Sequence, residues 1–522
     1  MFKKLLMLFK IGRKLATSGA LSSVYEIYNP PITIKVLFFI IGFNFENKKT
    51  NTNLSSGKKL CNALQEMGTT FIKLGQFLST RPDIIGESVS KELEKLQDKL
   101  PPFDLDVAKN ILRKELGPEN FEQIKNISDP VAAASIAQVH FANINVSGQK
   151  KNVAIKILRP NIEKVFNEEL DALMFLAYVV ENLIQKTKRL KLIEVVQLLR
   201  EITHLEMDFR FEAAAASELY ENTKNDFGFN VPKIYWNQTG KNVLCLDQVD
   251  GISIREVENL KLQNIDTKKL AQNIIQHFLR HAIRDGFFHA DMHQGNLFVK
   301  TDGSIVPVDF GIMGRLDKKN RKYLAEILYG FIKRDYQKVS EVHFIAGLVS
   351  KEFSKEEFAQ SLRSIGEPIF GQSSKNISGG KLLAQLFENT EKFKMQTQIQ
   401  LLLLQKTMVV VEGVARNLDP DANIWNISRP ILENWLKEMK DPINKANEVL
   451  TEASEVLKRL PDLPIIMDRA NDVMTLIAEG KFNPNTLAYH SLREEELKLE
   501  LIRNKILGGV LVLVIFVLLV FK

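Results

Sequence analysis

The chain reads Phe-His-Ala-Asp-Met-His-Gln-Gly-Asn at residues 288–296 and Val-Asp-Phe-Gly at residues 308–311. These two segments decide which fold and function the sequence predicts. Asp291 can accept a proton from a hydroxyl or orient an attacking nucleophile. The amide oxygen of Asn296 and the carboxylate of Asp309 are hard oxygen donors, which suit Mg²⁺ on nucleotide phosphates. A short hairpin is expected between Asn296 and Asp309. This spacing favours a catalytic site over a polar turn between buried strands.

A strand with one buried lysine precedes this segment. Val-Ala-Ile-Lys-Ile-Leu at residues 153–158 predicts an apolar strand that projects Lys156. A lone lysine in such a strand is usually found at a sheet edge. However, a lysine strand, an acidic helix, an Asp/Asn loop and Asp-Phe-Gly follow one another in the order typical of protein-kinase-like enzymes. Lys156 is therefore expected to bind the α- and β-phosphates of a nucleotide.

The partner of this lysine is expected on one acidic helix over residues 192–222, which contains Glu206, Asp208 and Glu212. Residues two apart on a helix point about 200° apart, so Glu206 and Asp208 cannot both face Lys156. We favour Glu206 as the partner, with Glu212 as the alternative. The spacing does not decide between them.

Alanine stands where kinases place glycine in the loop over the phosphates. The alanine Cβ restricts the positive-φ conformations open to glycine, so a stiffer loop is expected. An alanine-rich run is also typical of a helix, but Ile136, Val139 and Phe141 before the lysine strand favour a loop and hairpin. Besides Lys156, the expected nucleotide-binding residues are Val131, Ala132, Ala133, Ala134, Ser135, Ile136, Ala137, Gln138 and Val139.

Taken together, these motifs resemble the UbiB/ADCK family of atypical kinases, with the bacterial UbiB branch fitting best. Phe-Ile-Lys-Leu-Gly-Gln at residues 71–76 matches the family's Lys-x-Gly-Gln signature, and residues 79–83 continue the match. Residues 206–213 match its Glu-x-Asp helix, and residues 309–316 match its magnesium segment. The resemblance runs from about residue 57 to residue 320. It assigns the family's regulatory motif to Lys73, Gly75, Gln76 and Asp208.

The resemblance implies an α+β, protein-kinase-like bilobal fold with a helical N-terminal extension, a mainly helical large lobe and a C-terminal membrane helix. It implies binding of ATP and Mg²⁺, ATPase activity, weak or absent protein kinase activity and a role in ubiquinone biosynthesis. It also places the Lys-x-Gly-Gln helix over the nucleotide site. The expected catalytic residues are Lys156, Glu206 and Asp291, and the expected metal ligands are Asn296 and Asp309.

Two features depart from the family. Its catalytic loop often reads Asp-Pro-His-Pro-Gly-Asn, whereas Met292 and Gln294 replace both prolines here. Proline fixes φ, so a less rigid loop is expected. The family also commonly ends in two membrane segments, and one obvious apolar run closes this chain. The expected domains are residues 1–56 (basic and apolar), 57–125 (helical Lys-x-Gly-Gln extension), 126–250 (small lobe), 251–490 (helical large lobe) and 491–522 (charged helix and membrane anchor).

Composition favours a membrane-associated enzyme over a nucleic-acid-binding protein. The net charge is +7, but no basic-aromatic motif accompanies it, so anionic lipid is the expected partner rather than nucleic acid. With Cys61 and Cys245 as the two cysteines, neither a disulfide framework nor a cysteine metal site is expected. A reducing compartment is therefore expected for the catalytic part.

An uncharged run at residues 506–521 predicts a membrane anchor. As a helix it would reach roughly 24 Å, and flanking Arg503, Lys505 and Lys522 can close the gap to an apolar core of about 30 Å by snorkelling. The basic residues before it favour the bacterial inner membrane with the catalytic domain in the cytoplasm.

Residues 1–10 are basic and amphipathic, which fits an interfacial or a packed surface helix. Residues 32–43 predict a buried or interfacial helix.

The leading functional hypothesis is an ATP-binding UbiB-type protein that couples nucleotide turnover to membrane lipid intermediates of ubiquinone synthesis. Its expected partners are membrane lipid, ubiquinone precursors, other ubiquinone-biosynthesis proteins and a second copy of the chain. One alternative is a lipid or small-molecule phosphotransferase. Another is a nucleotide-binding scaffold. The presence of all four candidate catalytic and metal-binding residues argues against a scaffold, namely Lys156, Asp291, Asn296 and Asp309.

Overall fold

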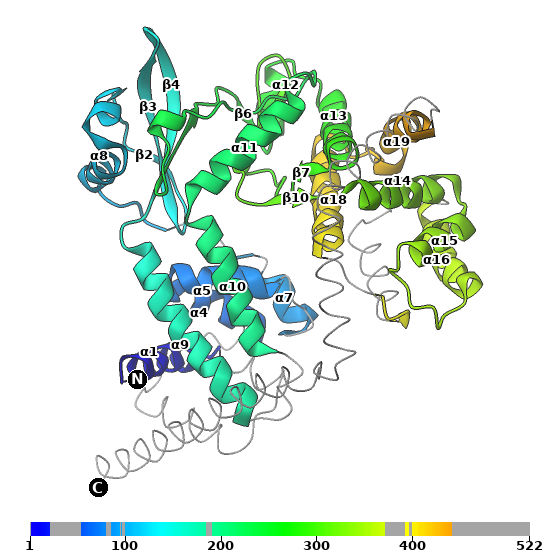
Figure 1. Ribbon diagram of the computed structural model, residues 1–522, viewed down its shortest axis with the longest axis horizontal. Coiled ribbons are helices and arrows are strands. Elements are labelled where there is room, and N and C mark those ends of the chain that lie inside the picture. Colours follow the sequence, from blue (N-terminus) through cyan, green and yellow to red (C-terminus); the bar gives the residue numbers. More distant parts are fainter. Residues whose placement is uncertain are drawn as a thin grey trace, which may run out of the picture. The chain divides into compact units, whose positions relative to one another are not determined.

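The lysine strand lies inside a five-stranded antiparallel sheet (Figure 1). The strand order is β1–β3–β4–β5, and β2 pairs with β3. Two residues with positive φ, Ser147 (50°) and Gly148 (83°), make the tight turn between β3 and β4, as hairpin twist requires. The strands are β1 (Ile124–Lys125), β2 (Pro130–Ala133), β3 (Ala137–Val146), β4 (Gln149–Leu158) and β5 (Val243–Asp247).

The two faces of this sheet serve different purposes. Strand side chains alternate in direction, so Val153, Ile155 and Ile157 enter a core with Ala108 and Leu112 of α8 (Leu105–Glu122). Lys156 therefore projects from the opposite face, where the charged residues gather. The sequence pattern thus sets both the strand and the direction of its lysine.

The computed structural model describes residues 2–20, 54–79, 85–93, 95–96, 100–183, 191–370, 392–395 and 399–440. The apolar run at 506–521, the segment at 32–43 and the predicted C-terminal membrane helix lie outside the described residues. Among the helices that are described, none combines the length and apolarity needed to cross a bilayer. The mixture of helices and sheets agrees with the predicted α+β kinase-like fold.

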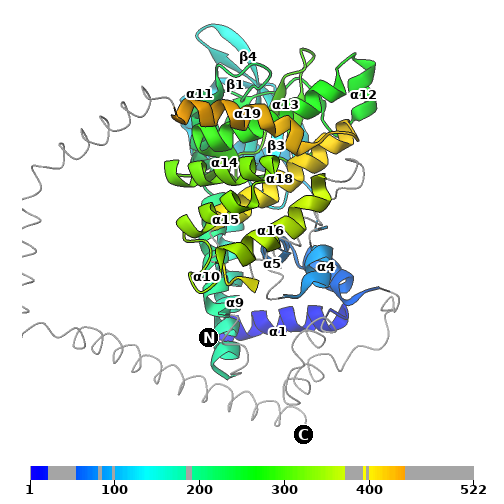
Figure 2. The same ribbon diagram turned by 90° about the vertical axis from the view of Figure 1, so that its right-hand side faces the viewer.

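A helical extension precedes the sheet and contains the Lys-x-Gly-Gln residues on α5. It packs against the long helices that follow the lysine strand, and Figure 2 shows α1 beside α4 and α9. The extension consists of α1 (Phe2–Thr17), α4 (Ser56–Met67), α5 (Thr69–Ser79), α7 (Glu87–Leu93) and α8. The helices after the lysine strand are α9 (Ile162–Leu183), α10 (Leu192–Glu206) and α11 (Phe209–Thr223).

The prediction of one continuous acidic helix over residues 192–222 is wrong. Met207 (φ −87°, ψ 0°) and Asp208 (φ −114°, ψ 94°) leave the helical conformation, which separates α10 from α11. The Asp208 carboxylate accepts a hydrogen bond from the Arg210 N–H and caps α11. Aspartate is a strong N-cap residue, and this preference is the sequence signal for the break.

The large lobe is built from helices around two small hairpins. β8 pairs with β9 between Asn296 and Asp309, as predicted, and β7 pairs with β10. α18 packs on α13 and contacts β10, which pairs with β7 just before the segment predicted to be catalytic. The elements are β6 (Ile252–Ser253), α12 (Val257–Leu262), α13 (Thr267–Arg280), η3 (His281–Asp285), β7 (Phe287–His289), β8 (Leu297–Val299), β9 (Ile305–Pro307), β10 (Met313–Arg315), α14 (Lys318–Lys333), α15 (Tyr336–Ile345), α16 (Lys355–Phe370), α18 (Ile399–Leu418) and α19 (Ile424–Lys440).

Gly314 tests the packing of the β7–β10 hairpin. A Cβ at this position would lie 2.1 Å from Cζ of Phe288, which is fully buried against Phe278. We expect Gly314→Ala to lower the free energy of unfolding by about 1–3 kcal/mol through overpacking. Gly413→Ala is the matched control, because its Cβ would meet nothing within 4 Å, and a helical alanine should stabilise by about 0.5–1 kcal/mol. Urea denaturation of both variants measures the difference, and equal effects would contradict this account.

Candidate functional site

Lys156 lies at the centre of a group of acidic side chains. Its Nζ is 2.9 Å from both carboxylate oxygens of Glu212 and 3.6 Å from Oδ2 of Asp309. The Phe209 ring covers it, with its centroid 5.3 Å from Nζ. The backbone N–H of Phe310 also donates to Glu212, at 3.4 Å. Glu212 therefore joins the lysine strand to the Asp-Phe-Gly segment.

Burial opposes the charges in this group, and it raises the pKa of Glu212 because Lys156 offsets burial and the nearby Asp309 only in part. Burial alone would lower the pKa of Lys156, but Asp309 and Glu212 more than offset it, so the pKa is raised and the amine stays protonated. Partial burial likewise disfavours the charged form of Asp309, yet Lys156 and the Gly311 N–H lower the pKa of this carboxyl to about 2. The side chain of Asp309 keeps 46% of its surface exposed. An ionised, accessible carboxylate suits a divalent cation.

The prediction that Glu206 pairs with Lys156 is wrong. Glu206 instead pairs with Lys73 on α5, with 2.9 Å between Nζ and Oε2. The break at Asp208 is the physical reason, because Glu206 ends one helix and Glu212 lies in the first turn of the next. The two carboxylates consequently serve two different lysines. The alternative partner from the sequence, Glu212, is the one observed.

The other residues of the Lys-x-Gly-Gln and Glu-x-Asp motifs include one that allows close helix packing and one that caps a helix. Gly75 allows close packing, since a Cβ there would lie 2.3 Å from Cδ1 of Leu96. Gln76 follows Lys73 by one helical turn. Asp208 caps α11 and pairs with Arg210 at 2.6 Å, and the hydrogen bond from Arg210 lowers the pKa of Asp208. Any regulatory role for these residues stays a prediction.

The loop that is predicted to be catalytic holds Asp291 beside Asn296. Nδ2 of Asn296 donates to Oδ2 of Asp291 at 3.0 Å and to its backbone carbonyl at 3.2 Å. The Asp291 N–H donates to Nδ1 of His289 at 3.1 Å, so the proton of this buried imidazole resides on Nε2. Met292, which replaces a family proline, is 1% exposed in the main core. Burial of Met292 therefore anchors the loop at this position.

The alanine-rich segment forms the predicted loop and hairpin. β2 contains Val131, Ala132 and Ala133, and β3 begins at Ala137. Arg159 donates to the Ala134 carbonyl at 3.0 and 2.9 Å. Thr69 of α5 donates to the Ser135 carbonyl at 3.1 Å. These bonds hold the loop between the sheet and the Lys-x-Gly-Gln helix.

Two polar side chains of this loop behave differently. The Gln138 amide bonds the backbone of Phe103 at 2.8 and 3.1 Å, so it anchors the hairpin. The Ser135 hydroxyl is fully buried and has no hydrogen-bond partner among the described residues. A buried hydroxyl without a partner costs free energy, which a phosphate oxygen would relieve. Neighbouring Ile136 is buried, and Val139 is half-buried on β3.

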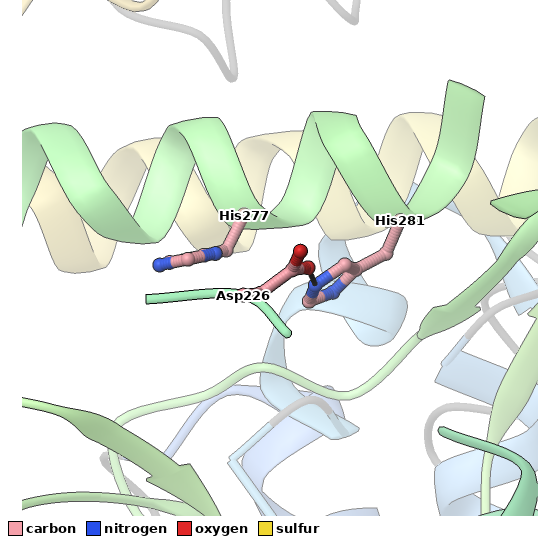
Figure 3. Close-up of side chains that lie close together, drawn as sticks. All are labelled: Asp226, His277 and His281. Carbon is pink, nitrogen blue, oxygen red and sulfur yellow. Dashed lines mark hydrogen bonds and ion pairs between the residues drawn. The ribbon is translucent and has the colours of Figure 1, made fainter. Parts of the chain in front are cut away.

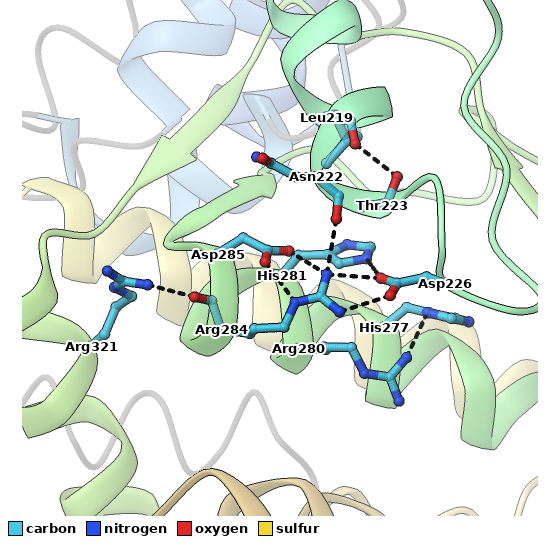
Figure 4. Close-up of polar contacts among 10 residues, drawn as sticks. All are labelled: Leu219, Asn222, Thr223, Asp226, His277, Arg280, His281, Arg284, Asp285 and Arg321. Atoms are coloured by element: carbon cyan, nitrogen blue, oxygen red, sulfur yellow. Dashed lines mark hydrogen bonds and ion pairs between the residues drawn. The ribbon is translucent and has the colours of Figure 1, made fainter. Parts of the chain in front are cut away.

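A second polar cluster joins Asp226, after α11, to His277 and His281 (Figure 3). Their possible ligand atoms all lie within 4.8 Å of one another. However, Arg284 donates to both carboxylate oxygens of Asp226, at 2.7 and 3.0 Å, and Nε2 of His281 lies 3.2 Å away (Figure 4). The guanidinium already supplies the positive charge that a metal would bring. The spacing of His277 and His281 by one helical turn is the signal that sequence reasoning missed.

This cluster ties the end of the Glu212 helix to the segment that enters the catalytic loop. Arg284 also donates to the Asn222 carbonyl at 3.2 Å, and Arg321 donates to the Arg284 carbonyl at 2.5 Å (Figure 4). Burial lowers the pKa of His277 to about 3, so this imidazole is neutral at physiological pH. The cluster is best described as a structural clamp.

Comparisons with known proteins agree with this architecture. Residues 95–343 match the model of the ABC1 atypical kinase-like domain, and residues 362–423 match the UbiB helical domain. The chain is 36% identical to the "Probable protein kinase UbiB" of Marinobacter nauticus over 477 residues, which cover 90% of this chain and 86% of the relative. A solved structure of Rv3197 with erythromycin, from Mycobacterium tuberculosis, is similar in fold, with a TM-score of 0.50, 24% identity and coverage of 72% of this chain and 95% of that one.

The fold and the matched domains define an atypical kinase-like protein. More specifically, the chain belongs to the UbiB family.

The clamp at Asp226 makes a pH-dependent contribution to stability. Burial disfavours the charged form, but His281 and Arg284 outweigh this and lower the pKa of Asp226. Because the folded pKa is depressed, the stabilisation is complete above the unfolded pKa of about 3.9 and is lost as the pH falls towards the folded pKa. We expect Asp226→Asn to cost about 1–3 kcal/mol of unfolding free energy at pH 7. The difference from wild type should shrink below about pH 4.

Urea denaturation between pH 7 and pH 3 checks this expectation. Asp302→Asn is the control, since the pKa of Asp302 is lowered mainly by Ser304 in its own surface turn. It should change stability by no more than about 0.5 kcal/mol. A penalty for Asp226→Asn that stays constant down to pH 3 would show that the carboxylate charge is not what stabilises the clamp.

Proposed function

We propose that this chain is a UbiB-type ATP-binding atypical kinase with ATPase activity, which acts in ubiquinone biosynthesis by coupling nucleotide turnover to membrane lipid intermediates. The observation that carries this proposal is the position of Lys156 between Glu212 and Asp309, at 2.9 and 3.6 Å. A protonated lysine beside an accessible ionised carboxylate fits a nucleotide phosphate and its metal ion.

The residues around Lys156 fit ATP and Mg²⁺. Asn296 directs its amide nitrogen to Asp291, which leaves its amide oxygen for a cation, and Asp309 adds an anionic oxygen. The unpartnered Ser135 hydroxyl fits a phosphate oxygen. Formal charges also support a cation: Lys73 and Lys156 contribute +2, while Glu206, Glu212, Asp291 and Asp309 contribute −4. Bound Mg²⁺ would neutralise charge on the transferred phosphoryl group.

Each residue then has a defined task. Lys156 binds phosphate oxygens through Nζ, and Glu212 holds Lys156 in place. Asp291 orients a water molecule and accepts its proton while the water oxygen bonds to the terminal phosphorus. The bond from that phosphorus to the ADP oxygen breaks, and the products are ADP and inorganic phosphate. A lipid or small-molecule hydroxyl in the place of water would give the phosphotransferase alternative.

The membrane part of the proposal rests on the sequence. The uncharged run at 506–521 would anchor the chain in the bacterial inner membrane, with the nucleotide site in the cytoplasm. Ubiquinone precursors carry long apolar tails, so a membrane-anchored ATPase could change their accessibility to other biosynthetic proteins. The ion pair between Lys73 and Glu206 would hold the Lys-x-Gly-Gln helix over the site and exclude protein substrates.

Asp291→Asn tests the chemical role. The amide keeps the shape of the side chain but cannot accept the proton, so ATP hydrolysis should fall at least about 100-fold. Affinity for MgADP should stay within about threefold of wild type, since Asp291 is not expected to bind the nucleotide. Asp302→Asn, in a surface turn, should match wild type in both assays.

The assay should use the full chain in liposomes with and without a ubiquinone precursor, with every phosphorylated product followed. Inorganic phosphate as the sole product supports the ATPase. A phosphorylated lipid would identify the phosphotransferase instead. Nucleotide binding without any turnover would support a scaffold, and wild-type hydrolysis by Asp291→Asn would refute the role of Asp291.

A further inference from the structure

Thr407 places a hydroxyl group on the otherwise apolar buried face of α18. The side chain of Thr407 is fully buried. The buried residues that share its face are apolar, namely Leu404, Val411, Val414, Ala415 and Leu418. Burying a hydroxyl costs free energy unless it forms a hydrogen bond, so the partners of Thr407 decide what it does.

Two backbone carbonyls lie within reach of the Thr407 hydroxyl. One belongs to Leu403, one turn earlier in the same helix, at 2.7 Å. The other belongs to Ala290, 117 residues away and immediately before Asp291, at 3.0 Å. The first contact is an ordinary back-bond of a helical threonine. The second crosses from the helical region to the catalytic loop, and the single hydroxyl hydrogen is shared between the two acceptors.

With this second contact, both edges of the peptide group that joins Ala290 to Asp291 form hydrogen bonds. Thr407 holds its carbonyl, and Nδ1 of His289 accepts from its N–H at 3.1 Å. The preceding N–H, that of Ala290, donates to the Ile312 carbonyl at 3.0 Å. A peptide group hydrogen-bonded on both edges is restrained from rotating, and its plane sets the direction in which the Asp291 side chain leaves the backbone.

We propose that Thr407 is a positioning residue for Asp291, through which the C-terminal helical region sets the geometry of the catalytic loop. The proposal rests on the ATP turnover proposed above. Within the described part of the chain, the hydrogen bonds of Thr407 reach the backbone of Ala290 and Leu403, and not the nucleotide-binding residues or the carboxylate of Asp291. Its effect is therefore expected in the chemical step rather than in nucleotide affinity, because orientation of a reacting group contributes to the rate.

Thr407→Val tests this role, since valine keeps the shape of threonine and removes its donor. We expect kcat for ATP hydrolysis to fall at least about fivefold, with KM for MgATP within about twofold of wild type. Thr407→Ser retains the donor and should restore kcat to within about twofold. Thr203→Val is the matched control, because Thr203 is an equally buried threonine that bonds its own i−4 carbonyl, Leu199, at 2.7 Å.

A second measurement separates failure of this proposal from failure of the proposed function. Hydrogen exchange by mass spectrometry on the peptide covering residues 287–295 reports the hydrogen bonds around Asp291 and does not require the protein to be active. Thr407→Val should speed exchange there, whereas Thr407→Ser and Thr203→Val should not. If wild type hydrolyses no ATP, the proposed function fails and the exchange data alone decide the role of Thr407. Unchanged exchange in Thr407→Val, or an equal change in Thr203→Val, would overturn the proposal.

Discussion

A protonated lysine inside a protein needs a partner that compensates its charge, and this requirement organises the site. Lys156 projects from the sheet face opposite the α8 core, so its charge meets the helices and the Asp-Phe-Gly segment instead of solvent. Glu212 accepts from both Lys156 and the Phe310 N–H. Removing one partner of such a buried pair leaves an uncompensated charge and is costly. The sheet, α11 and the Asp-Phe-Gly segment are therefore held in one arrangement.

The break between α10 and α11 extends this arrangement to the N-terminal helices. Without it, Glu206 and Glu212 would lie on one continuous helix. With the cap at Asp208, Glu206 binds Lys73 and Glu212 binds Lys156. The far end of α11 is fixed in turn by the clamp at Asp226. Both ends of the helix that carries Glu212 are thus held by ionic contacts.

Much of this could be predicted from local sequence. The alternation around Lys156 predicts the strand and the direction of its lysine, and the Asp291–Asn296 spacing predicts the loop. The pairing of Glu206 is hard to predict, because it depends on a break that only the N-cap preference of Asp208 marks, with no glycine or proline beside it. The Thr407 contact to Ala290 is equally hidden, since it joins residues 117 apart. Contacts between distant segments are set by tertiary packing, which a single sequence does not display.

The central claim is that Glu212, and not Glu206, balances the charge of Lys156. A double-mutant cycle with Lys156→Met and Glu212→Gln, followed by urea denaturation, measures this interaction directly. A parallel cycle with Glu206→Gln provides the comparison. We predict a coupling free energy of at least about 1.5 kcal/mol for Lys156 with Glu212 and a clearly smaller one for Lys156 with Glu206. A larger coupling to Glu206, or none to Glu212, would contradict the account.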